Sequence, residues 1–293
     1  VEIIDCIEFN DRFRYADVAA DVAFLAMDLA FQGRRELGEV FLAAYARAAD
    51  DCDLYGVVDF YQSYRAYVRG KVSSMLALDA SAEPAAREPA RELARKYYQL
   101  AYACTQQNLP QPTLYAIGGV IAAGKSSVAN EFARQLHAPI ADADQLRKRT
   151  AGADPQTPWH DPAFSGRYAP AQTDAVYAEL LRRAAVVLRS GRSMVLDASF
   201  RQRSQRAAAQ TLARELGCEF RFIECVAPPE VCRARLEKRA QGPSASDGRL
   251  EIFDDFVRSY EAVTELPETQ HVRFDTCLPA TQTEARVRAL LGQ

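Results

Sequence analysis

The stretch Ala116–Phe132 reads AIGGVIAAGKSSVANEF. Inside it, GVIAAGKS (Gly119–Ser126) fits the pattern G-x-x-x-x-G-K-[ST], in which glycines let successive backbone N–H groups point inward and bind phosphate oxygens. The lysine of the pattern reaches the terminal phosphates, and the hydroxyl that follows it ligates Mg²⁺. An apolar strand pattern precedes this loop and an amphipathic helix pattern follows it. We therefore predict a phosphate loop that binds ATP and Mg²⁺ through Gly119, Val120, Ile121, Ala122, Ala123, Gly124, Lys125, Ser126 and Ser127.

Short apolar runs alternate with helical patterns on both sides of this loop. The runs are TLYAIGGV (113–120), APIADA (138–143), SMVLDASF (193–200), CEFRFIECVAP (218–228) and HVRFDTC (271–277). Such alternation is typical of a parallel sheet that is covered by helices on both faces. We therefore predict an α/β domain over residues 113–293.

The first hundred residues differ in pattern from the rest of the chain. Apolar side chains recur at helical spacing from about residue 11 to 80, and again in ARELARKYYQLAYACTQQ (90–107). The segment DASAEPAAREPARE (79–92) fits either a loop or the start of a helix. We predict a mainly helical domain over residues 1–110. Because the chain begins at Val1 inside a strand-like run, VEIIDCIEF, we expect it to be a fragment of a longer protein.

The overall composition is that of an ordinary globular protein. A net charge of −3 provides no general basic field for nucleic acid. Seven scattered cysteines form no C-x-x-C pair, and the three histidines are isolated, so neither a disulfide framework nor a zinc site is indicated. No apolar run approaches the roughly 18 residues that span a bilayer. We expect a cytoplasmic protein that does not enter a membrane; the sequence identifies no partner protein.

Two aspartates follow predicted strands. Asp144 comes shortly after the run 138–143, with Arg147 three residues later, and Asp197 ends the apolar run 193–200. Ligands of open α/β sheets bind at the carboxyl ends of the strands. We predict that Asp144 orients or deprotonates an attacking hydroxyl, that Arg147 holds the substrate, and that Asp197 and Ser126 serve Mg²⁺. The alternative for Asp144 is the capping of a helix, which does not exclude catalysis.

The segment RARLEKRAQGPSASDG (233–248) places Arg235 and Arg239 one helical turn apart, ahead of a loop rich in small residues. This arrangement is typical of a lid that carries arginine to the transferring phosphoryl group. The alternative is a solvated basic helix end. We predict that Lys125, Asp144, Arg235 and Arg239 form the catalytic set.

Residues 113–293 resemble a phosphate-loop kinase domain of the group near polynucleotide kinase, gluconate kinase and zeta-type toxins. The resemblance rests on GGVIAAGKSS, DADQLRKRTAG, SMVLDASF and RARLEKR. It implies that Lys125 and Ser126 contact ATP and Mg²⁺, that Asp144 and Arg147 face the acceptor, and that Arg235 or Arg239 is the lid arginine. The loop interior IAA departs from the glycine and serine usual in such kinases.

Residues 1–110 resemble the C-terminal piece of an aminoglycoside-phosphotransferase-like domain. The residues that carry the likeness are IIDCIEFNDRFRYADVAADVAFLAMDL and YRAYVRGKV. Asp5 matches the aspartate that binds Mg²⁺ in that family. The nucleotide-binding lobe and the catalytic-loop aspartate would lie upstream of this sequence, so the resemblance implies a structural role for this domain here.

Two classes of function stay open at the level of sequence. The first is an ATP-dependent kinase that transfers the γ-phosphoryl group to a hydroxyl of a small molecule, such as a sugar or an aminoglycoside-like compound. A polynucleotide 5′-hydroxyl is the alternative acceptor, favoured by the spacing of Asp144 and Arg147 but not by the charge of the chain. The second class is a non-catalytic module that switches with bound ATP.

Overall fold

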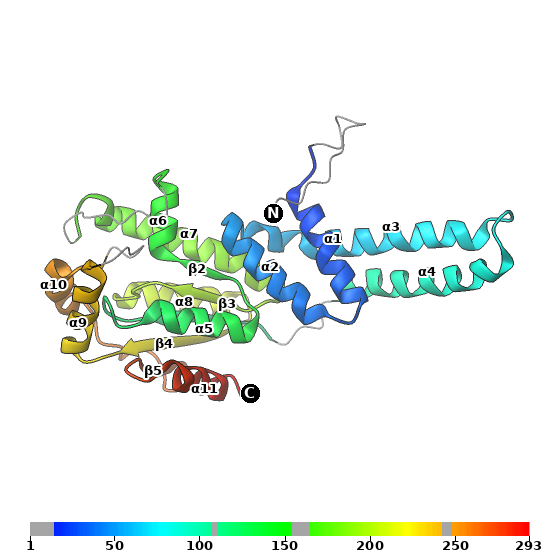
Figure 1. Ribbon diagram of the computed structural model, residues 1–293. Coiled ribbons are helices and arrows are strands. Elements are labelled where there is room, and N and C mark those ends of the chain that lie inside the picture. The colour runs from blue at the N-terminus through cyan, green and yellow to red at the C-terminus, as the bar shows by residue number, and fades with distance from the viewer. Residues whose placement is uncertain (1–14, 107–110, 154–163, 242–247, 293) are drawn as a thin grey trace. The chain divides into compact units, whose positions relative to one another are not determined.

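The computed structural model of the protein describes residues 15–106, 111–153, 164–241 and 248–292 (Figure 1). They form two compact units. The first contains the described parts of 1–42 and 54–108, and the second contains 43–53 together with the described parts of 109–293. The strand-like run at the N-terminus, with Asp5, lies outside the described residues.

The first unit is helical, as the apolar spacing predicts. Helix α1 (Val18–Phe31) packs on α3 (Val58–Leu78), which runs beside α4 (Pro84–Thr105) (Figure 1). Met27, Ala66 and Tyr97 are buried together between these helices, and the rings of Phe31 and Tyr97 stack with centroids 4.0 Å apart. Helix α2 spans Arg35–Ala49 and a short 3₁₀ helix, η2, spans Asp53–Gly56.

The segment 79–92, which the sequence leaves open, is mostly helical. Pro84 begins α4 and Pro89 follows within its second turn. Proline is tolerated at the first helical position because its missing N–H would have no partner there. The reading of this segment as the start of a helix is therefore confirmed, with Asp79–Glu83 as the connection.

The second unit is built on a five-stranded sheet in which every neighbouring pair is parallel. The strands are β1 (Thr113–Gly118), β2 (Ile140–Asp142), β3 (Met194–Asp197), β4 (Glu219–Val226) and β5 (His271–Asp275), in the order β2-β3-β1-β4-β5. Each strand lies within an apolar run that the sequence identifies. The predicted α/β class is therefore confirmed.

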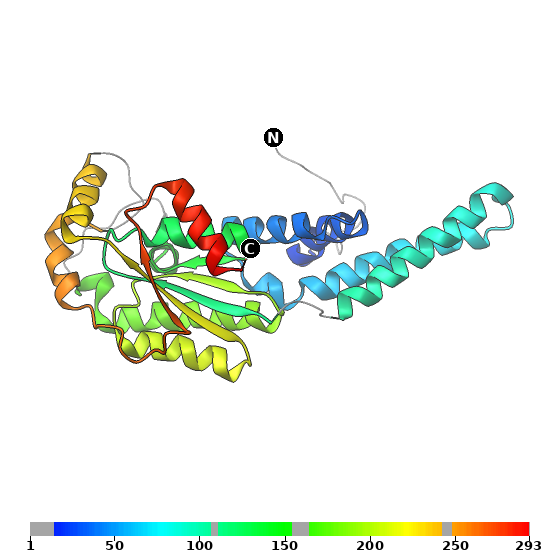
Figure 2. The same cartoon turned by 90° about the horizontal axis from the view of Figure 1, so that it is seen from below.

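Helices cover both faces of the sheet (Figure 2). Helices α5 (Lys125–Leu136) and α11 (Ala280–Leu290) pack on one face, and α7 (Pro170–Arg189) and α8 (Arg203–Glu215) on the other. Phe132 of α5 and Phe274 of β5 are fully buried in the core of the first face. Burial of one such side chain contributes about 2–3 kcal/mol. This core fixes α5 against the strands and so fixes the loop that precedes it.

The remaining elements of this unit are short. They are α6 (Ala143–Thr150), η3 (Gly166–Tyr168), α9 (Pro229–Ala240), η4 (Leu250–Ile252) and α10 (Phe253–Arg258). Figure 1 shows α6, α9 and α10 at the end of the sheet toward which the strands point. Among the residues that the structure describes, no helix combines the length and the apolar character needed to cross a membrane.

Candidate functional site

The loop between β1 and α5 is bent by backbone angles that favour glycine. The φ angle is +135° at Gly119, +60° at Ala122 and +87° at Gly124. A side chain is excluded at Gly119, because a Cβ atom there would lie 2.5 Å from the carbonyl oxygen of Cys225. Gly124 is the N-cap of α5, so the loop leads directly into a helix N-terminus. Free N–H groups and the positive end of the helix dipole therefore meet at this point, as anion binding requires.

The alanines in the loop interior are buried. Ala122 is 4% exposed and packs with Leu236 of α9 and Phe253 of α10. Ala123 is fully buried, and its N–H donates to the carbonyl of Val120 across 3.2 Å. The loop keeps its bend with alanine at these positions because its interior packs against α9 and α10. The left-handed backbone at Ala122 costs about 1–2 kcal/mol, which this packing offsets.

Arg235 supports the loop from outside. Its guanidinium donates to the carbonyl oxygen of Ala122 across 3.1 Å, and to the hydroxyl and the carbonyl of Thr276 across 3.1 and 2.6 Å. The Thr276 hydroxyl donates in turn to the carbonyl of Ala123 across 2.7 Å. The segment after β5 and helix α9 therefore hold the loop through its carbonyl groups.

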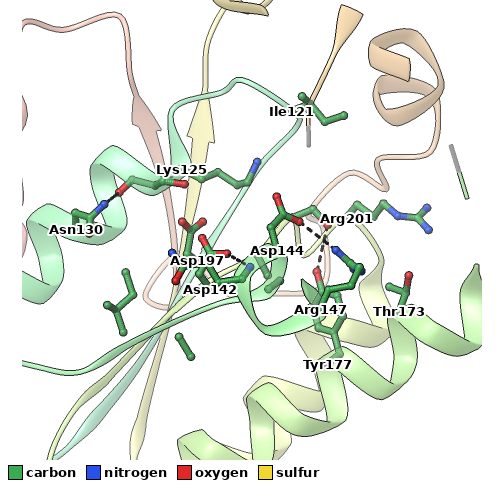
Figure 3. Close-up of a pocket in the computed structure, with 18 of the residues that line it drawn as sticks. Ile121, Lys125, Asn130, Asp142, Asp144, Arg147, Thr173, Tyr177, Asp197 and Arg201 are labelled. Atoms are coloured by element: carbon green, nitrogen blue, oxygen red, sulfur yellow. Dashed lines mark hydrogen bonds and ion pairs between the residues drawn. The ribbon is translucent and has the colours of Figure 1, made fainter. Parts of the chain in front are cut away.

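Lys125 and Ser126 begin α5. The Lys125 ammonium donates to the Val120 carbonyl across 2.9 Å, so the side chain lies over the loop. The Ser126 hydroxyl hydrogen-bonds to the carboxylate of Asp197, whose charge Lys125 also partly balances. Figure 3 shows Lys125 close to Asp142 and Asp197 at the ends of the strands. Ser126 and Asp197, which the sequence assigns to Mg²⁺, are thus in contact, and their role at a metal stays a prediction.

Two aspartates meet at the carboxyl ends of β2 and β3. Asp142 and Asp197 are partners in the register of the two strands, and their carboxyl groups hydrogen-bond to each other. Burial is the main cause that raises the pKa of Asp142, to about 7, and the Asp197 charge adds to it. Burial likewise raises the pKa of Asp197. Two buried carboxyl groups in contact share a proton unless a cation replaces it, which makes the pair suited to Mg²⁺ or its water shell.

Helix α6 continues directly from β2. The Asp142 carboxylate caps it by accepting from the N–H of Gln145 across 2.8 Å, so the cap is Asp142 and not Asp144. Asp144 stands in the first turn, 43% exposed, and pairs with Arg147 at 3.1 Å. The Arg147 guanidinium also lies over the Tyr168 ring, 4.5 Å from its centroid. Although Arg147 is only 8% exposed, its Nε has no hydrogen-bond partner among the described residues.

An aromatic wall faces Arg147 and Asp144. The Arg201 guanidinium lies over the Phe164 ring at 4.3 Å, and the Phe164 and Phe256 rings have centroids 4.9 Å apart. The Tyr177 hydroxyl accepts from the N–H of Phe200 across 2.8 Å and lies 3.2 Å from the hydroxyl of Ser199. Burial lowers the pKa of Arg201, which nevertheless stays charged at neutral pH. Arg147 and Arg201 are thus each held over an aromatic ring, that of Tyr168 and that of Phe164.

These groups line one cavity of about 380 Å³ (Figure 3). Such a volume is in the range of small-molecule sites. The predicted site residues that line it are Ile121, Ala122, Gly124, Lys125, Ser126, Ser127, Asp144, Arg147, Asp197 and Arg239. Gly119, Val120, Ala123 and Arg235 belong to the loop or its support and do not line the cavity. The catalytic, binding and metal roles of all these residues stay predictions.

Several lining residues escape the sequence reasoning. Asp142 is recognisable only by its place two residues before Asp144, at the strand end. Arg201 belongs to a run of arginines in which no single member stands out. Asp50 and Cys52 also line the cavity, from a stretch far upstream of the loop that carries no motif. The positions of these four residues in the cavity depend on long-range packing, which a local sequence pattern does not show.

The described ranges contain no group of three or more His, Cys, Asp or Glu side chains arranged to hold a metal ion. Mg²⁺ at nucleotide sites binds one or two protein oxygens together with waters and phosphate oxygens. Ser126, Asp197 and Asp142 supply oxygens of the required kind.

Comparisons with known proteins place this site in a family. A family model described as an AAA domain matches residues 114–263, about half of the chain. Uncharacterized proteins of Mycobacterium tuberculosis and Mycobacterium bovis are each 36% identical over 250 residues, which cover 85% of this chain and 48% of theirs. The chain therefore spans about half the length of the curated relatives it matches.

Solved structures with a similar fold include a gluconokinase and an APS kinase. A gluconokinase from Sinorhizobium meliloti is 20% identical, with a TM-score of 0.44, over 64% of this chain and 94% of its own. The APS kinase of Mycobacterium tuberculosis, in complex with AMPPNP and APS, is 22% identical, with a TM-score of 0.47, over 63% and 99%.

Proposed function

The chain belongs to the AAA-domain family that matches its residues 114–263, and from this premise we propose that it is an ATP-dependent kinase acting on a hydroxyl group of a small molecule. One observation supports this above all others. The helix that follows the phosphate loop and the carboxylates of two strand ends face the same cavity as Asp144 and Arg147. The residues predicted to bind phosphate and those predicted to bind the acceptor thus line a single volume, which supports the proposal.

On the nucleotide side, the loop amides and the N-terminus of α5 bind the phosphates of ATP. Lys125 leaves the Val120 carbonyl and reaches the β- and γ-phosphates as a point charge. Ser126 and Asp197 hold Mg²⁺, with Asp142 beside them. Mg²⁺ held by these residues would offset the negative charge of the phosphates.

On the acceptor side, Asp144 orients the hydroxyl and accepts its proton as the γ-phosphoryl group is transferred. Arg147 and Arg201 supply fixed positive charge beside it, held over the rings of Tyr168 and Phe164. A polycationic aminoglycoside would be repelled by these guanidinium groups. We therefore favour a neutral or anionic hydroxyl compound, such as a sugar or a sugar acid, within the small-molecule class.

Of the two predicted lid arginines, we assign the phosphoryl contact to Arg239. Its side chain lines the cavity, whereas the Arg235 guanidinium is engaged by Ala122 and Thr276. Arg235 then acts on the nucleotide through the shape of the loop. The cytoplasmic location stays a prediction, as does the likeness of residues 1–110 to an aminoglycoside phosphotransferase.

The test is transfer of labelled phosphate from γ-³²P-ATP to a panel of sugars, sugar acids, aminoglycosides and 5′-hydroxyl oligonucleotides, with Mg²⁺. We expect one of the small neutral or anionic compounds to be labelled. Asp144→Ala should lower that transfer by at least about 100-fold while the protein still binds ATP, because only proton transfer and orientation are lost. Labelling of oligonucleotides alone would establish the alternative acceptor.

A non-catalytic ATP switch is the other outcome of the same experiment. A switch would bind ATP, label no member of the panel and respond equally with or without the Asp144 carboxylate. This result would refute the kinase proposal.

A further inference from the structure

The segment 47–53 reaches the site from a distant part of the chain. It belongs to the same compact unit as the sheet, although it precedes the phosphate loop by many residues. The Arg47 guanidinium donates to the side-chain oxygen of Asn130 on α5 across 2.6 Å. The Asn130 amide donates in turn to the carbonyl of Ser126 across 2.6 Å. One end of the segment is thus tied to the first turn of the helix that begins at Lys125.

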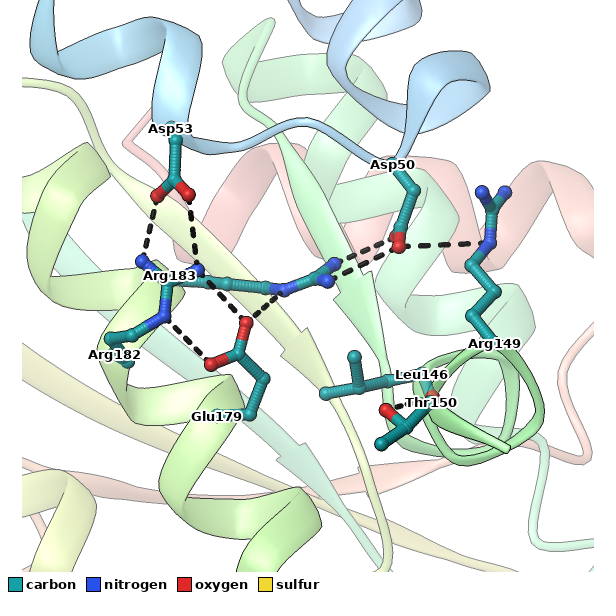
Figure 4. A network of polar contacts seen from close by, with 8 residues as sticks. All are labelled: Asp50, Asp53, Leu146, Arg149, Thr150, Glu179, Arg182 and Arg183. Atoms are coloured by element: carbon teal, nitrogen blue, oxygen red, sulfur yellow. Dashed lines mark hydrogen bonds and ion pairs between the residues drawn. The ribbon is translucent and has the colours of Figure 1, made fainter. Parts of the chain in front are cut away.

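Asp50 ties the middle of the segment to two other helices (Figure 4). Its carboxylate accepts both Nη groups of Arg183 on α7, at 2.7 and 3.1 Å, and lies 3.8 Å from Nε of Arg149 on α6. The Arg183 side chain is 12% exposed and is fixed from its other side by Glu179 at 2.9 Å. A bidentate, partly buried ion pair such as Asp50–Arg183 holds its geometry better than an ion pair on the surface.

Helix α6 depends on contacts with its neighbours to hold its position. It contains eight residues and follows a strand of three residues at the edge of the sheet. A helix of this length is not stable by itself in water. Ala143 and Leu146 are buried under it, Lys148 is fully buried in its last turn, and Arg149 of the same turn pairs with Asp50. The same short helix carries Asp144 and Arg147.

Building on the proposed function, we propose that Asp50 is a positioning residue for the acceptor side of the site. By joining Arg149 on α6 to Arg183 on α7, it sets where Asp144 and Arg147 stand relative to the phosphate loop. Asp50 lines the same cavity, but its carboxylate is taken up by Arg183 and Arg149, so we assign it the positioning of α6 rather than a contact with the reacting groups. The acceptor side of the kinase therefore depends on a segment that lies outside the matched family region of 114–263.

The neighbouring Asp53 offers a matched control. Its carboxylate accepts two hydrogen bonds from Arg182, which also lies on α7, in the same bidentate geometry at 2.7 and 3.2 Å. Both partners are about half exposed. The contacts of this pair join the segment 47–53 to α7 but do not reach α6. Loss of the Asp53–Arg182 pair therefore tests whether weaker attachment of the segment to α7 is enough to disturb α6.

The test compares hydrogen–deuterium exchange of the α6 amides in the whole 293-residue chain. Asp50→Asn and Arg149→Gln should each speed exchange over residues 143–150 by about three- to tenfold, since both break the same link. The double variant should add little to either, because the two residues act through one contact. Asp53→Asn should leave the exchange of α6 unchanged, and all four variants should bind a fluorescent ATP analogue as the wild type does.

The kinetic counterpart uses the acceptor found by the panel. Asp50→Asn should raise KM for the acceptor and leave KM for ATP within about twofold, a split that simple loss of folding would not produce. Unchanged α6 exchange in Asp50→Asn and Arg149→Gln, or an equal rise in Asp53→Asn, would overturn the proposal. Hydrogen–deuterium exchange is measured without turnover, so it tests Asp50 independently of the kinase activity. If exchange of α6 changes but no acceptor is labelled, Asp50 remains a support of α6 and only the proposed kinase function is refuted.

Discussion

Gly119 shows most directly how one residue determines whether the loop can form. Its φ of +135° and the Cys225 carbonyl 2.5 Å from the site of a Cβ leave no place for a side chain. Gly119→Ala should therefore destabilise the protein by about 2–4 kcal/mol and abolish binding of ATP. Gly217→Ala is the control: φ there is +66°, but nothing lies within 4 Å, so the cost should be about 1 kcal/mol with ATP binding intact. Denaturant unfolding and calorimetric titration measure both; equal effects of the two variants would contradict the account.

The carboxyl pair of Asp142 and Asp197 makes stability depend on pH when Mg²⁺ is absent. A folded pKa raised to about 7 at Asp142, above the ordinary value near 3.9, means that the folded protein binds a proton that the unfolded chain has released. Stability is therefore greater at acid pH and falls as pH rises through about 7. Asp142→Asn removes this loss because the amide never ionises.

Thermal unfolding in EDTA measures this effect. The variant should be more stable than the wild type at pH 8, and the difference should shrink toward pH 5.5. A difference that is the same at both pH values would show that the pair does not share a proton.

At the scale of elements, a variant of Arg235 distinguishes two roles for helix α9: a lid over the phosphates, or a support of the phosphate loop. The sequence suggests a lid arginine, whereas the structure shows its guanidinium on the carbonyls of Ala122 and Thr276. If Arg235 supports the loop, Arg235→Ala should weaken binding of an ATP analogue by about tenfold and destabilise the protein by about 1–3 kcal/mol. A lid arginine would lose kcat with ground-state binding unchanged.

Arg233→Ala on the same helix serves as the control for this comparison. Arg233 pairs with the exposed Asp254 and lies over the Phe253 ring instead of a loop carbonyl, so its loss should weaken nucleotide binding much less than the loss of Arg235. Unaltered analogue affinity in Arg235→Ala would restore the lid assignment.

The elements that the sequence predicts best are those whose signals are local. β1, α5 and the loop between them follow from an apolar run, a glycine pattern and an amphipathic run, all within Thr113–Leu136. The start of α4 at Pro84 is not decidable from sequence, because alanine and charged residues on either side suit both a loop and a helix. The cap of α6 is Asp142 rather than Asp144, a distinction that depends on where β2 ends. Single-residue boundaries of this kind depend on hydrogen bonds that spacing alone does not reveal.

At the scale of the whole molecule, long-range contacts determine what sequence patterns cannot. No sequence pattern around Asp50 or Asp53 predicts that residues 43–53 belong to the α/β unit. That membership comes from ion pairs to Arg182 and Arg183, which are more than a hundred positions away in the chain. The α/β class follows from local alternation, whereas the completion of the cavity by an upstream segment becomes visible only in three dimensions.

The most direct test of the central claim is a crystal structure of the chain with AMPPNP and Mg²⁺. The account predicts that the triphosphate lies along residues 119–126, with Mg²⁺ about 2.1 Å from the Ser126 hydroxyl. It also predicts that Asp142 and Asp197 contact the metal or its waters, and that Asp144 faces an open volume beside the γ-phosphate. A nucleotide bound elsewhere, or Asp144 turned away from the γ-phosphate, would contradict it.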